Sequence, residues 1–208
     1  MHDMHDKPTQ NQLLNTPPDA RGEGTGVSAV WLFIWDFLKI FVIALAIIIP
    51  IRFYLFQPFI VTGQSMLPTF HDGEYLIIDE ISYRITDPKR GEVAVIRSPQ
   101  DASQFFIKRI VGLSGETVEI SGGKVVITNE EFPRGFALSE NYLPASLSTF
   151  GNLRITLNDD QYFVLGDNRI ASSDSRVFGP ITRDSLVGRV FVRAFPLNRF
   201  NFFQAPAY

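Results

Sequence analysis

The sequence predicts a mainly β protein, in which an antiparallel barrel-like or sandwich-like domain follows one N-terminal transmembrane helix. Two observations support this prediction. Residues 29–56 hold the only long apolar run of the chain, and roughly 20 apolar residues are enough to cross a bilayer. From Gln57 onward, short segments rich in Val, Ile, Phe and Tyr alternate with Gly, Pro, Asp or Ser, which is typical of strands and turns.

The N-terminal part divides into a tail and an anchor. Residues 1–28 are polar and contain several Pro and Gly, so we expect a disordered tail. Residues 29–56 form the predicted anchor, in which Phe37–Phe56 has the length of a membrane helix. Asp36 and Lys39 stand three residues apart, so they share a helix face and can form an ion pair.

Two other interpretations of the apolar run are weaker. A cleaved signal peptide needs a small-x-small site after its apolar core, whereas Ala44-Leu45-Ala46 lies inside the run, before Ile47–Ile49. A buried core helix would need elements to surround it, and the rest of the chain predicts mainly strands. The few Lys and Arg residues near the run give little orientation bias by the positive-inside rule.

Seven segments of the β domain have the composition and the boundaries of strands. They are residues 74–79, 92–97, 105–111, 116–120, 124–128, 162–165 and 187–194. Ser121-Gly122-Gly123 joins two of them and predicts a hairpin. We therefore expect a β domain over residues 57–208, interrupted by a less regular insertion at about 129–160 whose role the sequence leaves open.

Composition excludes several kinds of site. The chain has no cysteine, which excludes disulfides, thiolate catalysis and Cys-ligated metals. Two of its three histidines lie in the polar tail, so only His71 could act in the β domain. The net charge is −3 and there is no basic run, which argues against a nucleic-acid partner.

The stretch Thr62–Phe70, TGQSMLPTF, presents a candidate nucleophile. Gly63 permits a sharp turn and close backbone approach. Pro68 fixes φ and withholds an N–H, so neither a helix nor a central strand should continue through this stretch. Ser65 therefore lies on a turn shortly after the anchor. The alternative is that Ser65 is an ordinary turn serine. Other parts of the chain have to distinguish this interpretation from that of a nucleophile.

A serine hydroxyl is a weak nucleophile until a neighbouring base takes its proton. His71 lies in a His-Asp-Gly turn that we expect to face solvent, and Leu67 stands where a G-x-S-x-G elbow needs its second glycine. Lys108 is the one lysine inside an apolar strand, where burial would lower its pKa. Strand alternation places it on the same face as Phe106 and Ile110. An edge-strand gatekeeper lysine is the alternative interpretation.

Residues 166–179, GDNRIASSDSRVFG, form a polar loop after a predicted strand. Two acids, two arginines and three serines indicate a fixed network, in which Asp–Arg pairs lock the loop by bidentate hydrogen bonds. One serine could hydrogen-bond to the lysine amine and orient it. The alternatives are a metal loop and a carboxylate acid–base pair. The interpretation as a metal-binding loop is weak, because the arginines would repel a cation and the EF-hand spacing is absent.

Together these stretches resemble type I signal peptidase, a membrane-anchored serine protease with a Ser-Lys dyad. TGQSMLPT resembles the nucleophile box of that family, and GEVAVIRSP resembles its second β box. FIKRIVGLSGE resembles the lysine box, and GDNRIASSDSRVFG resembles the C-terminal box, which is highly specific. The resemblance covers the chain from the anchor to about Phe195, with the boxes in the family's order.

The resemblance implies a role for several residues. Ser65 would be the nucleophile and would offer its backbone N–H as an oxyanion-hole donor, with Lys108 as general base. Ser172 would orient the lysine amine. Three charged residues would hold the loop: Asp167, Asp174 and Arg176. Some family members carry a serine as second oxyanion-hole donor two residues before the nucleophile, where this chain has Gly63.

The family's substrates are exported preproteins with small residues at the first and third positions before the cut, the A-x-A pattern. By resemblance, four residues are candidates for the shallow apolar substrate pockets: Val61, Met66, Phe106 and Ile107. Phe106 and Ile107 point to opposite faces of an ideal strand. The substrate is expected to bind in an extended conformation, as an added strand beside the nucleophile segment.

The resemblance also implies a single-pass protein of the bacterial cytoplasmic membrane, with its catalytic domain on the outer face and no need of a metal or cofactor. We expect a monomer that acts at the lipid bilayer. The aromatic stretches Phe53–Phe59 and Phe195–Phe203 could touch the membrane or pack on the β domain. The rivals are another Ser-Lys maturation peptidase of related fold and a non-catalytic membrane-tethered β adaptor. The adaptor predicts loss of Ser65 or Lys108, and both are present.

Overall fold

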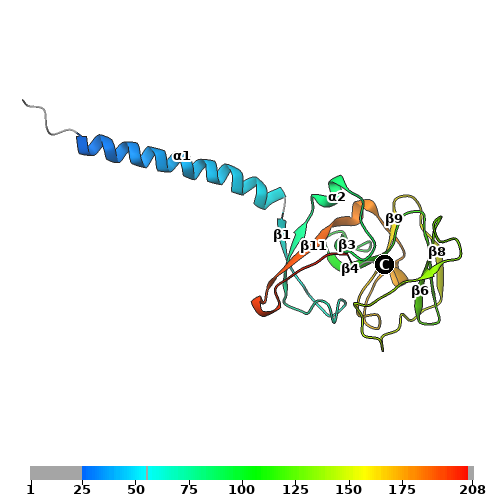
Figure 1. Ribbon diagram of the computed structural model, residues 1–208. Helices are drawn as coiled ribbons and strands as arrows, with labels where there is room; N and C mark the ends of the chain where they lie inside the picture. The colour runs from blue at the N-terminus through cyan, green and yellow to red at the C-terminus, as the bar shows by residue number, and fades with distance from the viewer. Residues whose placement is uncertain (1–24, 55, 206–208) are drawn as a thin grey trace, which may run out of the picture. The chain divides into compact units, whose positions relative to one another are not determined.

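A computed structural model describes residues 25–54 and 56–205 of the protein. In this part of the chain the structure has one long helix, α1, and a mainly antiparallel β region with short helical turns (Figure 1). The polar tail expected at the N-terminus lies outside the described residues up to residue 24. The predicted fold class is confirmed.

Helix α1 spans Thr25–Tyr54. Its stretch Val30–Ile49 has a mean hydropathy of 2.6 and is not buried. A helix that is apolar on all sides and exposed is suited to lipid rather than to water, and this stretch is long enough to cross a bilayer. Lys39 Nζ lies 3.1 Å from a carboxylate oxygen of Asp36, as their spacing predicts.

The larger sheet curls into a half-barrel with the strand order β1-β2-β11-β3-β4-β9-β10, and β12 pairs with β11. Its strands are β1 (Phe56–Ile60), β2 (Tyr75–Asp79), β3 (Val93–Arg97), β4 (Phe105–Gly112), β9 (Gln161–Leu165), β10 (Ile181–Thr182), β11 (Leu186–Phe195) and β12 (Asn201–Phe202). Strand β4 lies between β3 and β9, inside the sheet. Strand β1 lies at one end of it.

The smaller sheet has the order β7-β6-β5-β8. Its strands are β5 (Thr117–Ser121), β6 (Lys124–Thr128), β7 (Phe136–Ala137) and β8 (Leu153–Thr156). The predicted hairpin joins β5 to β6 through Gly122 and Gly123, which have φ angles of +56° and +80°. Positive φ at both central residues suits the twist of a two-residue hairpin. The segment expected as an irregular insertion supplies β7 and β8, so part of it is sheet.

All seven predicted strands are present, each within one residue of its predicted ends. The sequence missed β1, in which Pro58 removes a ladder donor and weakens the strand pattern. It also missed β8, with its four residues, and the two-residue strands β7, β10 and β12. Short helical turns occur at α2 (Ser82–Ile85), α3 (Ser175–Phe178), η1 (Arg183–Ser185) and η2 (Leu197–Arg199).

The nucleophile stretch is held by buried apolar side chains that follow Ser65. Met66 and Phe70 are 2% and 0% exposed. They share a core cluster with Leu76 of β2 and Val95 of β3. Burying such side chains contributes about 1.5–3 kcal/mol each, so the turn that carries Ser65 is fixed to the large sheet.

The C-terminal aromatic stretch has two roles. The ring centroid of Phe203 lies 4.6 Å from that of Phe70, so Phe203 packs on the β domain. Phe195, Phe200 and Phe202 are each 52–56% exposed. The stretch therefore contributes both to the core and to an exposed aromatic surface.

Candidate active site

Ser65 and Lys108 meet although they are 43 positions apart in the chain: Lys108 Nζ lies 2.8 Å from Ser65 Oγ. Ser65 follows Gly63, whose φ of +89° turns the chain sharply. Lys108 lies on β4 opposite Ala94 of β3 and is 3% exposed. Because β4 is an inner strand and the lysine is buried, the gatekeeper interpretation does not fit this residue.

The burial of Lys108 favours its neutral form. Its Nζ lies 5.4 Å from the centroid of the Phe106 ring, on the face that strand alternation predicts. Burial lowers the pKa of Lys108 from 10.5 to about 8, although the charges of Asp174 and Asp167 act in the opposite direction. A buried amine with this pKa can accept a proton near neutral pH.

A cleft of about 290 Å³ opens beside these two side chains. All four residues predicted for the substrate pockets line it: Val61, Met66, Phe106 and Ile107. Both Phe106 and Ile107 reach the wall of the cleft, although an ideal strand would point them to opposite faces. Phe59 and Ile60 of β1 form another part of the wall, so the cleft involves the end strand β1 and the inner strand β4.

The two predicted oxyanion-hole positions, Ser65 and Gly63, differ in the hydrogen bonds of their backbone N–H groups. Among the described residues, the Ser65 N–H donates to no acceptor. The Gly63 N–H donates to a carboxylate oxygen of Asp72 at 2.7 Å, and glycine has no side chain to offer. The Ser65 N–H is therefore the donor that this geometry leaves available.

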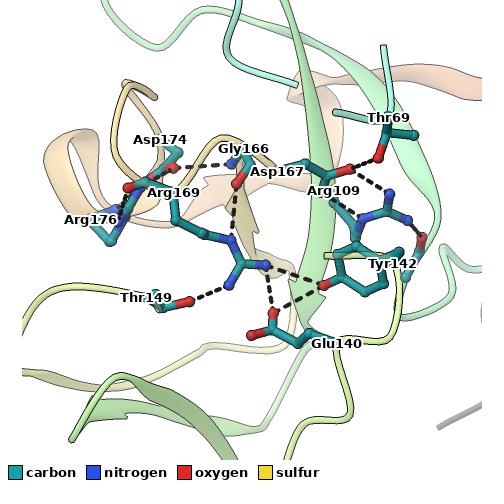
Figure 2. A network of polar contacts seen from close by, with 11 residues as sticks. Thr69, Arg109, Glu140, Tyr142, Thr149, Gly166, Asp167, Arg169, Asp174 and Arg176 are labelled. Carbon is teal, nitrogen blue, oxygen red and sulfur yellow. Dashed lines mark hydrogen bonds and ion pairs between the residues drawn. The ribbon is translucent and has the colours of Figure 1, made fainter. Parts of the chain in front are cut away.

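Asp167 joins three segments around the site (Figure 2). Its carboxylate accepts two hydrogen bonds from the Arg109 guanidinium, at 2.8 and 2.6 Å. It also accepts one from the Thr69 hydroxyl at 2.5 Å. Because Asp167 is 0% exposed, these bonds hold the nucleophile stretch against β4 and the C-terminal loop.

Asp174 and Arg176 form the bidentate pair that the sequence predicts, with both hydrogen bonds at 2.8 Å. Asp174 is also the N-cap of α3, since its carboxylate accepts from the Arg176 N–H, and it accepts from the Gly166 N–H at 3.0 Å. Arg176 donates to the Arg169 carbonyl at 2.8 Å. These contacts close the C-terminal loop on itself.

The sequence missed the partners of Arg169. Its guanidinium reaches three side chains of the segment 129–160 and one backbone carbonyl: Glu140, Tyr142, Thr149 and Gly166 (Figure 2). The segment therefore helps to hold the C-terminal loop. The sequence also missed Thr69, Arg109 and Asn168 as site residues. For Arg109 the available signal was its position next to Lys108.

Ser172 lies at the centre of the site without the predicted hydrogen bond. Its Oγ is buried and has no hydrogen-bond partner among the described residues. A Cβ added at Gly166 would lie 2.1 Å from this Oγ and 2.5 Å from the Ser65 carbonyl oxygen. Gly166 thus lets Ser172 and the Ser65 backbone come close together, and orientation of Lys108 by Ser172 stays a prediction.

His71, the alternative base, lies away from Ser65. His71 is exposed, as predicted, and its Nδ1 lies 3.8 Å from Glu74 rather than beside Ser65. Within residues 25–54 and 56–205, no group of three His, Cys, Asp or Glu side chains could hold a metal ion. The site therefore consists of a serine, a buried lysine and a polar network that holds both.

A serine hydroxyl beside a buried amine, in an antiparallel β domain with an adjoining cleft, is the arrangement that a serine hydrolase with a lysine base requires. Residues 34–195 match the family described as "Signal peptidase, peptidase S26". The chain belongs to this signal peptidase I family of serine endopeptidases, which remove signal peptides from secreted preproteins. Its N-terminal helix is a membrane-spanning anchor.

Two relatives agree with this assignment. The chain is 40% identical over 168 residues to probable signal peptidase I-2 of Synechocystis sp., covering 77% of this chain and 73% of that protein. It is 34% identical over 170 residues to signal peptidase I T of Bacillus subtilis, covering 77% and 84%. A crystal structure of a signal peptidase I from Enterococcus faecalis is 31% identical, with a TM-score of 0.43, and the match covers 51% of this chain and 98% of that one.

Proposed function

We propose that Ser65 is the nucleophile and Lys108 the general base of signal-peptide removal. The observation that carries this proposal is the 2.8 Å separation of Lys108 Nζ and Ser65 Oγ. It is supported by the burial that lowers the pKa of the lysine to about 8. A base has to lie within hydrogen-bonding reach of the proton it removes and has to be neutral at the working pH.

The reaction then follows from these groups. Neutral Lys108 takes the proton of Ser65 as Oγ bonds to the scissile carbonyl carbon, and the carbonyl oxygen becomes an oxyanion that accepts from the Ser65 N–H. The oxyanion collapses, the C–N bond breaks, and Lys108 returns its proton to the leaving amine. Water, deprotonated by Lys108, cleaves the resulting ester and restores the Ser65 hydroxyl.

The substrate we propose is an extended preprotein segment with small residues at the A-x-A positions. The cleft wall at Val61, Met66, Phe106 and Ile107 is apolar and close to the dyad. Small side chains fit a shallow apolar pocket. Strand β1 is an end strand, so its outer edge leaves backbone groups that an extended peptide could pair with.

We place the β domain on the outer face of the bacterial cytoplasmic membrane, as a monomer anchored by α1. The anchor would hold the dyad at the bilayer, where signal peptides present their cleavage sites. The exposed rings of Phe195, Phe200 and Phe202 give the domain an aromatic surface suited to the lipid headgroup region. Protease accessibility of the domain in sealed vesicles tests this orientation.

The test of the dyad is cleavage of an A-x-A precursor in detergent and lipid by the wild type and by Lys108→Arg and Ser65→Ala. Arginine keeps the charge but cannot accept the proton, so we expect a loss of roughly 100-fold or more, as for removal of a general base. Lys124→Arg, at an exposed lysine of β6, is the control. A folded Lys108→Arg enzyme that cuts nearly as well as the wild type would show that the lysine is structural.

A further inference from the structure

Asn168 is hydrogen-bonded to the backbone on both sides of the nucleophile. Its side-chain Nδ2 donates to the Gln64 carbonyl at 3.1 Å, and its backbone N–H donates to the Ser65 carbonyl at 3.0 Å. These two carbonyls belong to the peptide units before and after Ser65. We propose that Asn168 is a positioning residue that aims the Ser65 N–H at the oxyanion. This inference rests on the proposed role of Ser65.

The asparagine itself is held in one orientation. Its Oδ1 accepts a hydrogen bond from the Ala171 N–H at 3.2 Å, while its Nδ2 faces a carbonyl, which can only accept. The two ends of the amide therefore cannot exchange without losing both bonds. The neighbours of Asn168 are also fixed, because Asp167 and Arg169 are 0% and 1% exposed and both belong to the buried polar network.

The geometry of the peptide bond transmits this constraint to the oxyanion donor. The Gln64 carbonyl and the Ser65 N–H belong to one planar trans unit, in which C=O and N–H point in opposite directions. A hydrogen bond that fixes the carbonyl therefore fixes the direction of the N–H. The bond from Asn168 to the Ser65 carbonyl restrains the following unit in the same way.

A preoriented donor acts mainly in the transition state. The negative charge that the Ser65 N–H would stabilise forms only when the carbonyl carbon becomes tetrahedral, so its direction matters little for binding the uncleaved peptide. Removing a donor from an oxyanion hole lowers kcat about 100- to 1,000-fold. Loss of the Asn168 side chain leaves the donor present and its peptide unit less firmly held, since the Leu67 N–H still donates to the Gln64 carbonyl at 3.2 Å, so we expect a smaller loss of about 10- to 100-fold.

The test compares Asn168→Ala and Asn168→Asp with the wild type. Aspartate keeps an acceptor for the Ala171 N–H, so it preserves the local turn if alanine does not, and it replaces the donor to Gln64 with a charged oxygen that cannot donate. The matched control is Asn129→Ala, because Asn129, just after β6, also accepts from the backbone N–H three residues on and donates through Nδ2. Its Oδ1 accepts from the Phe132 N–H at 2.8 Å and its Nδ2 donates to Glu116 at 2.9 Å.

We expect the Asn168 variants to lower kcat about 10- to 100-fold with KM within about 2-fold of the wild type. Asn129→Ala should leave both constants unchanged for the folded enzyme. Ser65 adds to a peptide aldehyde with an A-x-A sequence: the Oγ–C bond forms, the Oγ proton passes to Lys108, and the C=O π bond opens to leave a tetrahedral oxygen in the oxyanion hole. Its affinity should fall with kcat/KM in the Asn168 variants, whereas the matching peptide alcohol, which forms no adduct, should bind as before.

Two outcomes would overturn the inference: kcat within about 2-fold of the wild type, or equal weakening of aldehyde and alcohol binding. Ser65→Ala separates this failure from failure of the proposed dyad. If Ser65→Ala still cleaves the precursor, the proposed function fails. If Ser65→Ala is inactive and the wild type binds the aldehyde, but the Asn168 variants match the wild type, then only the role of Asn168 fails.

Discussion

The Arg109 guanidinium and the Asp167 carboxylate form a two-point ion pair, at 2.8 and 2.6 Å, whose side chains are 5% and 0% exposed. Arg109 follows Lys108 on β4, and Asp167 lies in the loop after β9 and also accepts from Thr69. The pair therefore joins the strand of the lysine to the stretch of the serine. The position of the dyad depends on a buried charge pair that the reaction does not use.

Removing one partner of this pair should destabilise the fold strongly. Within the described residues, Arg109→Ala leaves the buried Asp167 carboxylate with one side-chain hydrogen-bond partner, Thr69, and breaking a buried pair costs about 3–5 kcal/mol. Urea unfolding in detergent measures this loss. Arg154→Ala is the control, since Arg154 pairs with Glu119 at 2.9 Å but its side chain is 69% exposed, and exposed pairs contribute about 0–1 kcal/mol. Similar losses in the two variants would contradict the prediction.

Activity should depend on the protonation of Lys108. Because the base has to be neutral and its pKa is lowered to about 8, kcat/KM should fall about tenfold for each pH unit below that value. Above it, the rate should level off. The measurement is the pH profile of precursor cleavage in detergent. A rate that stays constant between pH 6 and 9 would contradict the assignment of Lys108 as base.

The same pKa predicts an effect on stability. The folded-state pKa of about 8 lies below the ordinary 10.5, so between these values the unfolded chain binds more protons and stability rises with pH. Below pH 8 the buried cation destabilises the fold, by at most about 3 kcal/mol. Lys108→Met should therefore be more stable than the wild type at pH 7, and the difference should vanish near pH 11. Urea unfolding at several pH values measures both; a less stable variant at pH 7 would contradict the prediction.

Gly166→Ala should lower kcat about 100-fold in the folded enzyme. The new Cβ would lie 2.5 Å from the Ser65 carbonyl oxygen, so the nucleophile backbone would have to shift, and a displacement of about 1 Å can cost about 100-fold in rate. Gly112→Ala is the control. Its Cβ would meet Val118 at 2.4 Å in the core, so it should lose stability by about 1–3 kcal/mol and keep its kcat. Equal kcat in both variants would refute the explanation.

Ser172→Ala should separate stability from activity. The Ser172 hydroxyl is buried without a partner among the described residues, and such a group costs about 1–3 kcal/mol. Its removal should leave stability unchanged or higher, whereas loss of lysine orientation should lower kcat roughly 10-fold or more. The control is Ser175→Ala, because Ser175 Oγ accepts from the Val164 N–H at 2.9 Å and its loss should reduce stability. Thermal unfolding measures the stability of each variant, and precursor cleavage measures its kcat. Full activity of Ser172→Ala would rule out the orienting role.

Local patterns in the sequence were sufficient for most of the fold. Strands such as β4 and the β5–β6 hairpin have strand-type composition, alternation and turn glycines of their own, so they were predicted within one residue. Strands β7, β10 and β12 have two residues each. They exist only because a partner strand supplies their hydrogen bonds, and no local signal predicts that pairing.

By itself, the sequence determined the β class, the apolar anchor and the two residues proposed for catalysis, because apolar periodicity and short motifs are local properties. Only the tertiary structure decided how those residues are held. Asp167 bonds to Thr69 across 98 positions, and Asn168 bonds to Gln64 across 104. Such contacts depend on how buried loops come together around a sheet, and the direction of a hydrogen bond is fixed only after the core has packed.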